Sequence, residues 1–264
     1  MKINSNGPLL ILGKNGQVGS ALAKILFSEK SQGSFWDGII LQWDSQEANF
    51  LNPDKILQKL DQYKPSLIIN ASAYTAVDSA ESDTAKALQI NALTPGEIAK
   101  WCHRNNCVFI HYSTDYVFSN LTNSESPFSE TDSTGPINFY GKSKLIGEQL
   151  IEASECQYFI FRTSWVYSAV GVNFLKTILK LACEKEKINI VCDQWGSPTY
   201  AGDIAQATMK IILQIKNRDI IPCGIFHMSG NGYTNWYEFA LGIIQTANHL
   251  EYSIKENKIF KLKE

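Results

Sequence analysis

Five short apolar runs separated by helix-like stretches constrain the fold of this chain more than any other feature. The runs cover residues 9–12, 39–43, 67–70, 108–112 and 158–162. Each is a few residues long and apolar at successive positions, as expected of a strand covered by helices on both faces. Strands that alternate with helices pair in parallel through crossover connections. The pattern therefore predicts a doubly wound α/β fold.

The chain after residue 165 follows a less regular pattern. Helices are predicted over 173–182, 201–215 and 236–247, and strands over 188–192 and 224–228. No repeat or low-complexity linker separates this part from the rest. We expect a main domain over residues 1–165 and a smaller substrate-binding lobe over 166–264, with interleaving of the two left open.

A further helix start is predicted between the third and fourth runs. Thr94, Pro95 and Glu97 have the types and spacing of a capped first turn, in which the hydroxyl and the carboxylate satisfy free backbone N–H groups. This helix should run to Arg104 and lead into the strand that begins at Val108.

Charge and hydropathy exclude several classes of partner. The 264 residues carry a net charge of −2 without a long run of lysine or arginine, so we expect no binding to nucleic acid or to an anionic membrane. No stretch approaches the roughly 18 apolar residues of a spanning helix, and the first apolar run is too short for a signal peptide. A cytoplasmic protein is expected.

The cysteines are even in number but have no framework spacing. They are Cys102, Cys107, Cys156, Cys183, Cys192 and Cys223. In the cytosol we expect them to be reduced and to serve as small buried hydrophobic residues. Cys102, His103, Cys107 and His111 resemble zinc ligands, but they lack a paired Cys-x-x-Cys and overlap an apolar strand, so no metal is expected.

The first apolar run continues into a glycine-rich turn, Gly-Lys-Asn-Gly-Gln-Val-Gly over 13–19, and then into a helical pattern over 20–27. A strand, a tight turn and a helix start direct backbone N–H groups at a pyrophosphate. Three glycines alone would be only a turn, but this position predicts a Rossmann-type dinucleotide site. The cofactor-binding residues expected here are Gly13, Asn15, Gly16, Gln17, Val18 and Gly19.

Asp44 ends the second apolar run, where a carboxylate can accept hydrogen bonds from the adenosine ribose. This favours NADH, and residues 45–52 contain no lysine or arginine for a 2′-phosphate. A basic residue from elsewhere in the fold could still meet that phosphate, and Lys14 in the glycine turn is one candidate, so NADPH stays open. An ordinary acidic turn residue is the alternative interpretation of Asp44.

Tyr140 and Lys144 stand four residues apart in a helical segment over 141–153, so they share a helix face. A neighbouring ammonium stabilises a phenolate and lowers the pKa of the phenol. The pair is predicted to be a catalytic acid, with a solvated surface pair as the alternative.

The fourth apolar run ends in Ser-Thr-Asp-Tyr over 113–116, and ligands of open α/β sheets bind at the carboxyl ends of strands. A hydroxyl at this end can hold a substrate oxygen beside Tyr140. Chemistry alone does not choose between Ser113 and Thr114. A turn that bonds its own backbone is the alternative.

Six segments together resemble the dTDP-4-dehydrorhamnose reductases, a family of the extended short-chain dehydrogenase/reductase superfamily. They are residues 13–19, 70–78 (Asn-Ala-Ser-Ala-Tyr-Thr-Ala-Val-Asp), 113–118, 140–144, 162–167 and 193–199 (Asp-Gln-Trp-Gly-Ser-Pro-Thr). The resemblance implies reduction, with NADH or NADPH, of the 4-keto group of dTDP-4-dehydro-6-deoxy-L-mannose to dTDP-L-rhamnose, a step of cell-surface polysaccharide synthesis such as that of lipopolysaccharide.

The resemblance also implies roles for individual residues. Tyr140 would give a proton to the carbonyl oxygen, Lys144 would hold the nicotinamide ribose and lower the pKa of the tyrosine, and Thr114 would orient the ketone. Cofactor would also contact Ala71, Ser72 and Ala73. Substrate would contact Thr75, Val77, Thr114, Asp115, Tyr116 and Trp165, the last as an apolar wall beneath the sugar.

The chain departs from the family pattern at two places. Residues 248–264 contain neither the Arg-Pro nor the Asn-Ser that close over the sugar nucleotide, which predicts a shortened substrate lobe. Ala21 and Gly202 stand where some members have glutamates that bind magnesium between subunits. We therefore expect a monomer or weak homodimer with no bridging metal.

Two other functions are compatible with the same pattern. A nucleotide-sugar epimerase or dehydratase is one, although a dehydratase needs a second acid where Tyr116 follows Asp115. The other is a dinucleotide-binding regulatory subunit, like that of methionine adenosyltransferase. The missing Arg-Pro and Asn-Ser favour it, and the intact Thr114, Tyr140 and Lys144 argue against it.

Overall fold

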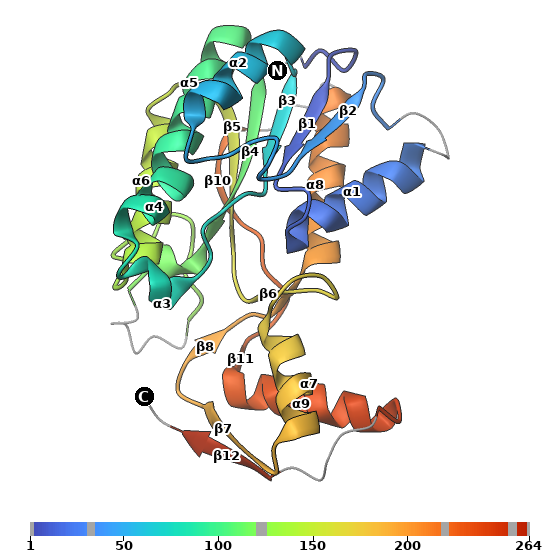
Figure 1. Ribbon diagram of the computed structural model, residues 1–264, viewed down its shortest axis with the longest axis vertical. Helices are drawn as coiled ribbons and strands as arrows, with labels where there is room; N and C mark the ends of the chain where they lie inside the picture. Colours follow the sequence, from blue (N-terminus) through green and yellow to red (C-terminus); the bar gives the residue numbers. More distant parts are fainter. Residues whose placement is uncertain (1–2, 31–34, 120–125, 218–221, 253–257, 263–264) are drawn as a thin grey trace.

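The computed structural model describes residues 3–30, 35–119, 126–217, 222–252 and 258–262. Figure 1 shows a parallel sheet with helices on both faces and, beyond one end of the sheet, a smaller lobe that holds the last helix and strand. The two parts follow one another along the long axis of the molecule.

The main sheet has six strands in the order β10-β5-β4-β3-β1-β2, all parallel. The strands are β1 (Leu9–Leu12), β2 (Ile40–Trp43), β3 (Leu67–Asn70), β4 (Val108–Thr114), β5 (Gln157–Thr163) and β10 (Gly224–His227). The predicted α/β fold is confirmed. The chain order reverses between β1 and β3, and ligands of such sheets bind beyond the carboxyl ends of the strands at this place.

Helices cover the sheet on both faces (Figure 1). One layer holds α1 (Gln17–Lys30) and α8 (Ala201–Lys216), and the other holds α2 (Pro53–Tyr63), α4 (Thr84–Leu88), α5 (Thr94–Asn105) and α6 (Phe139–Glu152). Because side chains alternate along a strand, Leu9 and Ile11 pack into the first core, and Leu10 and Leu12 into the second. Burial on both sides explains why the strand sequences are continuously apolar.

Helix α5 begins at the predicted residue, Thr94, but the predicted capping of its first turn is wrong. Helical structure runs from α4 through a π-helical turn, η1 (Gln89–Leu93), directly into α5, and no side chain caps α5. The Thr94 hydroxyl instead donates to a backbone carbonyl of the loop before α2, at 2.6 Å. Pro95 lacks an N–H and its ring would clash with the carbonyl of Asn91 in a regular α-helix, which the wider π turn relieves.

The smaller lobe packs α7 (Phe174–Glu184) and α9 (Trp236–His249) on a two-stranded parallel sheet of β7 (Lys187–Val191) and β12 (Lys258–Leu262). The sequence analysis did not predict β12, whose two lysines and partly exposed apolar residues resemble a surface segment. Two short ribbons connect the lobe to the sheet, β6 (Val166–Tyr167) with β9 (Thr199–Tyr200) and β8 (Trp195–Gly196) with β11 (Thr234–Asn235).

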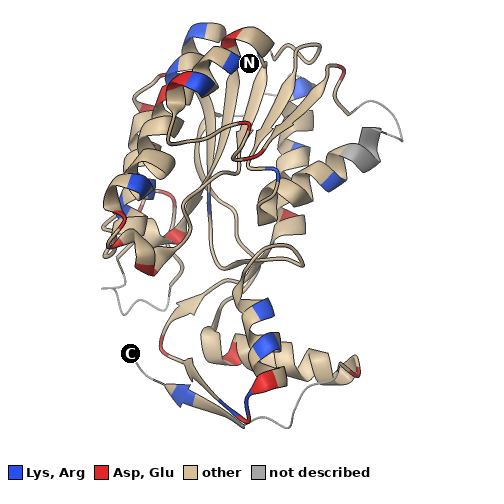
Figure 2. Ribbon diagram, viewed as in Figure 1, with Lys and Arg blue, Asp and Glu red and all other residues tan. Residues whose placement is uncertain are grey.

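The chain passes between the two parts more than once, because α8 and β10 return to the main sheet after α7 and β7. The division at residue 165 into a main domain and a smaller substrate-binding lobe stays a prediction. Figure 2 shows both signs of charge interspersed over the outer helices and the lobe. Among the helices of the described residues, none is long and apolar enough to cross a bilayer.

The expectation of six buried cysteines is wrong for three of them. Cys102, Cys107 and Cys156 are buried, Cys192 is half-buried, and Cys183 and Cys223 are exposed. Cys183 lies in the last turn of α7. Cys223 lies directly before β10, which is an edge strand and has a neighbouring strand on one side only. All six cysteines lie among the described residues, and none of them forms a disulfide there.

Candidate active site

The glycine turn after β1 packs against the end of β3. Gly13 has a φ of 82°, and a side chain there would lie 2.8 Å from the backbone of Ala71. Gly16 donates from its N–H to the carbonyl of Gly13 at 3.0 Å, and Gly19 approaches the same carbonyl so closely that no Cβ fits. Helix α1 starts at Gln17, before the predicted residue 20. Glycine is therefore required by geometry at both ends of the turn.

Asn15, Lys14, Asp44 and Glu47 form a partly exposed cluster beside this turn. Asp44 Oδ2 lies 3.3 Å from Asn15 Nδ2 and 3.4 Å from Lys14 Nζ. Lys14 Nζ donates to Glu47 Oε2 at 2.7 Å, which raises the pKa of the lysine and lowers that of the glutamate. The backbone N–H of Gln46 lowers the pKa of Asp44. The cation expected to meet a 2′-phosphate is thus already paired with carboxylates.

Gln17 connects the start of α1 to the chain that leads into the smaller lobe. Its Nε2 donates to the carbonyl of Val166 at 3.2 Å, and its Oε1 accepts from Ser168 at 3.2 Å and Asn173 at 2.9 Å. Val18 packs its side chain against the core under α1 and α8. The side chain of Gln17 is therefore occupied, and its backbone remains the part directed at a ligand.

The predicted catalytic hydroxyls come together at the end of β4. Thr114 ends the strand and donates from Oγ1 to Asp115 Oδ1 at 3.1 Å, and its hydroxyl lowers the pKa of the phenol of Tyr140 in the first turn of α6. Tyr116 packs its ring edge against Tyr140, with 5.7 Å between centroids. Ser113 Oγ, the other candidate, is buried with no hydrogen-bond partner among the described residues. Geometry therefore favours Thr114.

The predicted lowering of the Tyr140 pKa is wrong, and Lys144 is not among the described groups that shift it. Burial raises the pKa of Tyr140 to about 12, with the Thr114 hydrogen bond opposing it. Lys144 Nζ points elsewhere: it donates to the carbonyl of Tyr112 at 2.6 Å and lies 3.1 Å from His111 Nε2. Burial lowers the pKa of Lys144 itself to about 8. The tyrosine therefore keeps its proton at neutral pH, as a proton donor must.

His111 lies in a buried polar chain that the sequence did not predict. Its Nδ1 is 3.0 Å from Nδ2 of Asn70, whose Oδ1 accepts from the N–H of Ser72 at 3.0 Å. Burial, reinforced by the charge of Lys144, lowers the pKa of His111 well below its usual value. The residue once grouped with possible zinc ligands is therefore an uncharged member of the site.

A buried ion pair lies one helical turn beyond Lys144. Glu148 accepts two hydrogen bonds from Arg162 Nε, at 3.1 and 3.2 Å, and one from Nη2 at 2.7 Å. The two side chains are 2% and 5% exposed. The guanidinium carbon lies 5.0 Å from the ring centre of Phe118. Tyr140, Lys144 and Glu148 thus form one face of α6 directed at the sheet.

Asn91 in the π turn clamps the loop after β3 to α6. Its Oδ1 accepts from the N–H of Tyr74 at 2.8 Å, and its Nδ2 donates to the carbonyl of Tyr74 and to Ser143 Oγ, each at 3.0 Å. This holds the loop containing the predicted ligand contacts. Ala71 and Ser72 are half-buried there, Ala73 and Thr75 are exposed, and Val77 starts α3 (Val77–Ala80).

Trp165 lies where the chain leaves the sheet. It has a φ of 45°, and its ring stacks on Trp236 with centroids 3.5 Å apart and an interplanar angle of 9°. Gly196 packs so closely on the ring that a Cβ there would lie 2.5 Å from Trp165 Cε2. The predicted role of Trp165 as a wall beneath a sugar stays a prediction.

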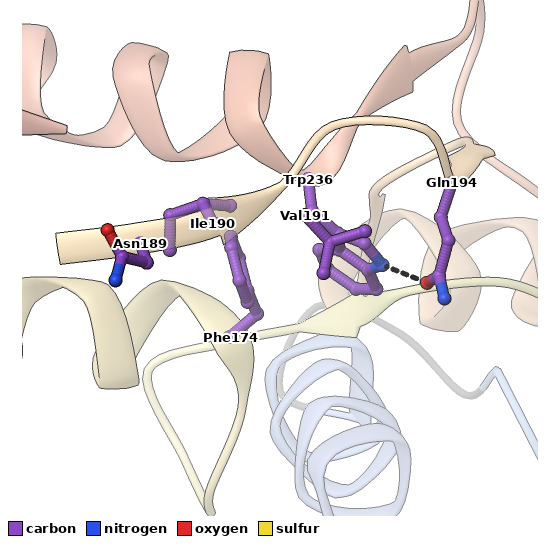
Figure 3. A pocket seen from close by; sticks show the side chains of 6 residues that line it. All are labelled: Phe174, Asn189, Ile190, Val191, Gln194 and Trp236. Carbon is purple, nitrogen blue, oxygen red and sulfur yellow. Dashed lines mark hydrogen bonds between the residues drawn. The ribbon is translucent and has the colours of Figure 1, made fainter. Parts of the chain in front are cut away.

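Trp236 of this stack lines a pocket of about 300 Å³ in the smaller lobe (Figure 3). Its lining comprises Phe174, Asn189, Ile190, Val191, Gln194 and Trp236. Trp236 donates from Nε1 to Gln194 Oε1 at 3.1 Å, which fixes the orientation of the amide. Gln194 belongs to the segment 193–199 that the sequence analysis singled out.

The residues at the end of β1 fit a dinucleotide. The backbone of the turn is open to close approach because Gly13, Gly16 and Gly19 carry no side chain, and the free N–H groups of α1 begin there. Asp44 places its carboxylate beside this turn, at the end of β2. These groups would hold the pyrophosphate and the adenosine ribose, and Tyr140 and Lys144 lie along the same edge of the sheet.

Comparison with known proteins decides the family. The model described as the RmlD substrate binding domain matches residues 7–259. The chain belongs to this family. A dTDP-4-dehydrorhamnose reductase of Burkholderia thailandensis is 39% identical over 239 residues, which are 89% of this chain and 77% of the relative. Another from Escherichia coli K12 is 37% identical over 255 residues, 95% of this chain and 82% of the relative.

Solved structures of RmlD relatives agree with the fold. The dTDP-4-dehydrorhamnose reductase of Bacillus anthracis, determined in complex with NADP, superposes with a TM-score of 0.85 at 33% identity. The match covers 97% of this chain and 85% of that one. The resemblance inferred from the six segments is confirmed.

Four side chains of the site escaped the sequence analysis, namely Glu47, Asn91, His111 and Glu148. A signal existed for Glu148, because it continues the four-residue spacing of Tyr140 and Lys144 on α6. The others are brought to the site by pairing between distant segments. Local patterns contain no signal of such pairing.

Proposed function

We propose that this RmlD family member reduces the 4-keto group of dTDP-4-dehydro-6-deoxy-L-mannose to give dTDP-L-rhamnose, with NADH or NADPH as the reductant. The observation that carries the proposal is the position of Tyr140 and Lys144 at the end of β4: the Tyr140 ring packs on Tyr116 and Lys144 Nζ donates to the carbonyl of Tyr112, at the edge of the sheet where the glycine turn also lies. The names of the relatives and the NADP complex of one of them support the same activity.

Each residue has a distinct part in the proposed reaction. The bound nicotinamide supplies the hydride. Tyr140 gives the proton of its phenol to the keto oxygen, and its raised pKa keeps that proton in place until the oxygen becomes basic. Thr114 turns its single hydroxyl hydrogen from Asp115 Oδ1 to the keto oxygen and so orients the ketone. Asp115, whose pKa burial raises to about 6, borders the same position.

Lys144 contributes from below the tyrosine. In the proposed reaction its Nζ holds the nicotinamide ribose. The hydrogen bond from Nζ to the backbone carbonyl of Tyr112 keeps the lysine side chain in place. Burial of the lysine excludes water from this side. Glu148, two turns along α6 from Tyr140, favours the charged form of the lysine.

The substrate contacts are part of the proposal. We place the sugar between the loop with Thr75 and Val77 and the Asp115–Tyr116 turn, with Trp165 on its apolar side. The nucleotide then extends toward the smaller lobe. A cytoplasmic location and a monomeric or weakly dimeric state remain predictions.

Oxidation of NADH or NADPH with dTDP-4-keto-6-deoxy-L-mannose, followed by absorbance, tests the function directly. We expect consumption of reductant that depends on the sugar and yields dTDP-rhamnose by mass spectrometry. Binding of the dinucleotide without any consumption would contradict the reductase and support a regulatory subunit. Loss of water from a dTDP-hexose would instead support a dehydratase.

A further inference from the structure

Two side-chain amides, those of Gln17 and Asn173, join the first turn of α1 to the first turn of α7. The backbone N–H of Lys176 can only donate, so the Asn173 atom 3.1 Å from it is the carbonyl oxygen Oδ1. The NH₂ of Asn173 therefore faces Gln17 at 2.9 Å, and the Gln17 atom there is Oε1. Gln17 Nε2 then donates to the carbonyl of Val166 at 3.2 Å. Each amide in this row thus has one orientation.

The loop between β6 and α7 packs around the same glutamine side chain. Asn173 Nδ2 uses its second hydrogen on the carbonyl of Ser168, at 2.8 Å. Ser168 Oγ has a single hydrogen and lies closer to the carbonyl of Val170, at 2.8 Å, than to Gln17 Oε1, at 3.2 Å. Asn173 is therefore the stronger donor to Gln17. Gly171 has a φ of 75°, and a Cβ there would lie 3.3 Å from Gln17 Cγ.

The backbone of Gln17 belongs to the dinucleotide half of the site. Gln17 is the first residue of α1, and the first N–H groups of a helix have no partner within it and can meet a pyrophosphate. The turn before it is closed by the N–H of Gly16 on the carbonyl of Gly13, at 3.0 Å. A ligand that orders this turn therefore also fixes the Cα from which the amide of Gln17 extends.

The other end of the link lies beside the pocket of the smaller lobe. Asn173 is the N-cap of α7, and its side chain accepts from the N–H of Lys176. The next residue, Phe174, lines the pocket together with Trp236 (Figure 3), and the centroids of the two rings are 4.4 Å apart. The first turn of α7 thus sets one wall of the pocket.

We propose that Gln17 is a positioning residue that couples dinucleotide binding to the smaller lobe. A ligand at its backbone N–H fixes its side-chain amide, and the amide holds Asn173 and with it the first turn of α7. The inference rests on the proposed function for the identity of the dinucleotide, NADH or NADPH. Coupling between two binding sites is reciprocal, so a ligand in the pocket tightens the dinucleotide by the same factor.

Hydrogen exchange of the full-length protein tests this coupling without any sugar nucleotide. The probe is NADH or NADPH, whichever binds more tightly in a fluorescence titration, at a saturating concentration. In the wild type we expect the backbone amides of residues 168–177 to exchange about fivefold more slowly once the dinucleotide is bound, the lower end of usual couplings. Unchanged exchange there, with dinucleotide bound, would overturn the proposal.

Gln17→Met keeps the length of the side chain and removes its amide. Because the dinucleotide meets the backbone of the turn, bound ligand should still slow exchange at residues 13–20. The slowing at residues 168–177 should disappear. A variant that slows exchange in both segments as the wild type does would contradict the role of the amide.

Asn173→Ser tests the same link from the other side. Serine caps a helix about as well as asparagine, so α7 keeps its start, but the NH₂ that reaches Gln17 is gone. The slowing at residues 168–177 should again disappear. A double variant with Gln17→Met should lose no more than either single variant, because both remove one link. An additive loss would overturn the single route through Gln17.

Gln89→Met is the matched control. It also removes a partly buried amide hydrogen bond, from Nε2 to Thr94 Oγ1 at 2.9 Å, but within one continuous helical segment. Its slowing at residues 168–177 should equal that of the wild type, and loss of the slowing here would contradict a specific role of Gln17. Failure to reduce the keto sugar with the exchange pattern intact would refute the proposed function alone. An active reductase without the slowing would refute the coupling alone.

Discussion

Two lysines at the same edge of the main sheet differ in exposure, in their partners and in the direction of their pKa shifts. Lys14 is 28% exposed and pairs with Asp44 and Glu47, whereas Lys144 is 1% exposed and contacts His111 and a backbone carbonyl. Carboxylates raise the pKa of Lys14, and burial lowers that of Lys144 to about 8. The charged side chains around Lys14 can rearrange for different ligands because they are partly exposed. The buried hydrogen bonds of Lys144 are satisfied in one arrangement.

The largest expected effect belongs to the buried side. Tyr140→Phe removes the proposed proton donor and should lower kcat by about 10²- to 10⁴-fold. The dissociation constant of NADH, measured by fluorescence titration, should change little because the ring remains. Turnover close to that of the wild type would contradict the assignment of Tyr140 as the proton donor.

The ion pair behind Lys144 should dominate stability. Glu148→Gln leaves Arg162 buried without its carboxylate, which costs about 3 to 5 kcal/mol in the free energy of unfolding. Urea denaturation followed by circular dichroism measures it.

Glu97→Gln is the exposed control, because it breaks a surface pair with Lys100 of 2.8 Å between Nζ and Oε1. Its cost should stay below about 1 kcal/mol. Equal losses in the two variants would remove the energetic distinction between buried and exposed pairs.

Asp115 predicts a pH dependence of stability. Its folded-state pKa of about 6 lies above the usual 3.8, so its stabilising contribution is complete below pH 4 and disappears as the pH rises through 6. Between pH 4 and pH 7 the wild type should lose about 1 to 2 kcal/mol relative to Asp115→Asn in urea denaturation.

Asp44→Asn sharpens the contrast, since the pKa of Asp44 is lowered and its contribution is lost as the pH falls. The two variants should therefore differ from wild type in opposite directions with pH. If the free energy of unfolding relative to wild type changed with pH in the same direction for both variants, the distinction between Asp115 and Asp44 would be contradicted.

The smallest effect concerns cofactor choice at the exposed cluster. Glu47→Gln frees Lys14 from its 2.7 Å partner and should improve binding of 2′,5′-ADP relative to 5′-ADP by about two- to fivefold, measured by calorimetry. Asp44→Ala should instead weaken NADH more than NADPH. An unchanged preference in both variants would exclude this cluster from ribose recognition.

The sequence predicted what is encoded locally. The runs that became β1 to β5 are identifiable because burial on both faces demands continuous apolar residues, and the glycine turn because Gly13 needs a positive φ. Tyr140 and Lys144 were predicted to share one face of a helix because residues four apart lie on the same side of an α-helix, and both belong to α6. The choice of Thr114 over Ser113 required the family resemblance, and its role stays a prediction.

What escaped prediction depends on partners far along the chain. His111 is 41 residues from Asn70 and 33 from Lys144, so no periodicity links them. The direction of the Tyr140 pKa shift failed because spacing on a helix says nothing about where a lysine nitrogen finds acceptors. The capping predicted at Thr94 failed because the same residue types also fit the interior of a continuous helix.

The π turn before Pro95 has a consequence for evolution of the chain. A regular α-helix advances about 100° per residue, and so one extra residue in a turn rotates everything after it by that angle. Deleting a single residue from Gln89–Leu93 would keep the helix yet turn Asn91 away from the loop that it clamps. Sequences that differ there by one residue can therefore share a fold and lose the link between the β3 loop and α6.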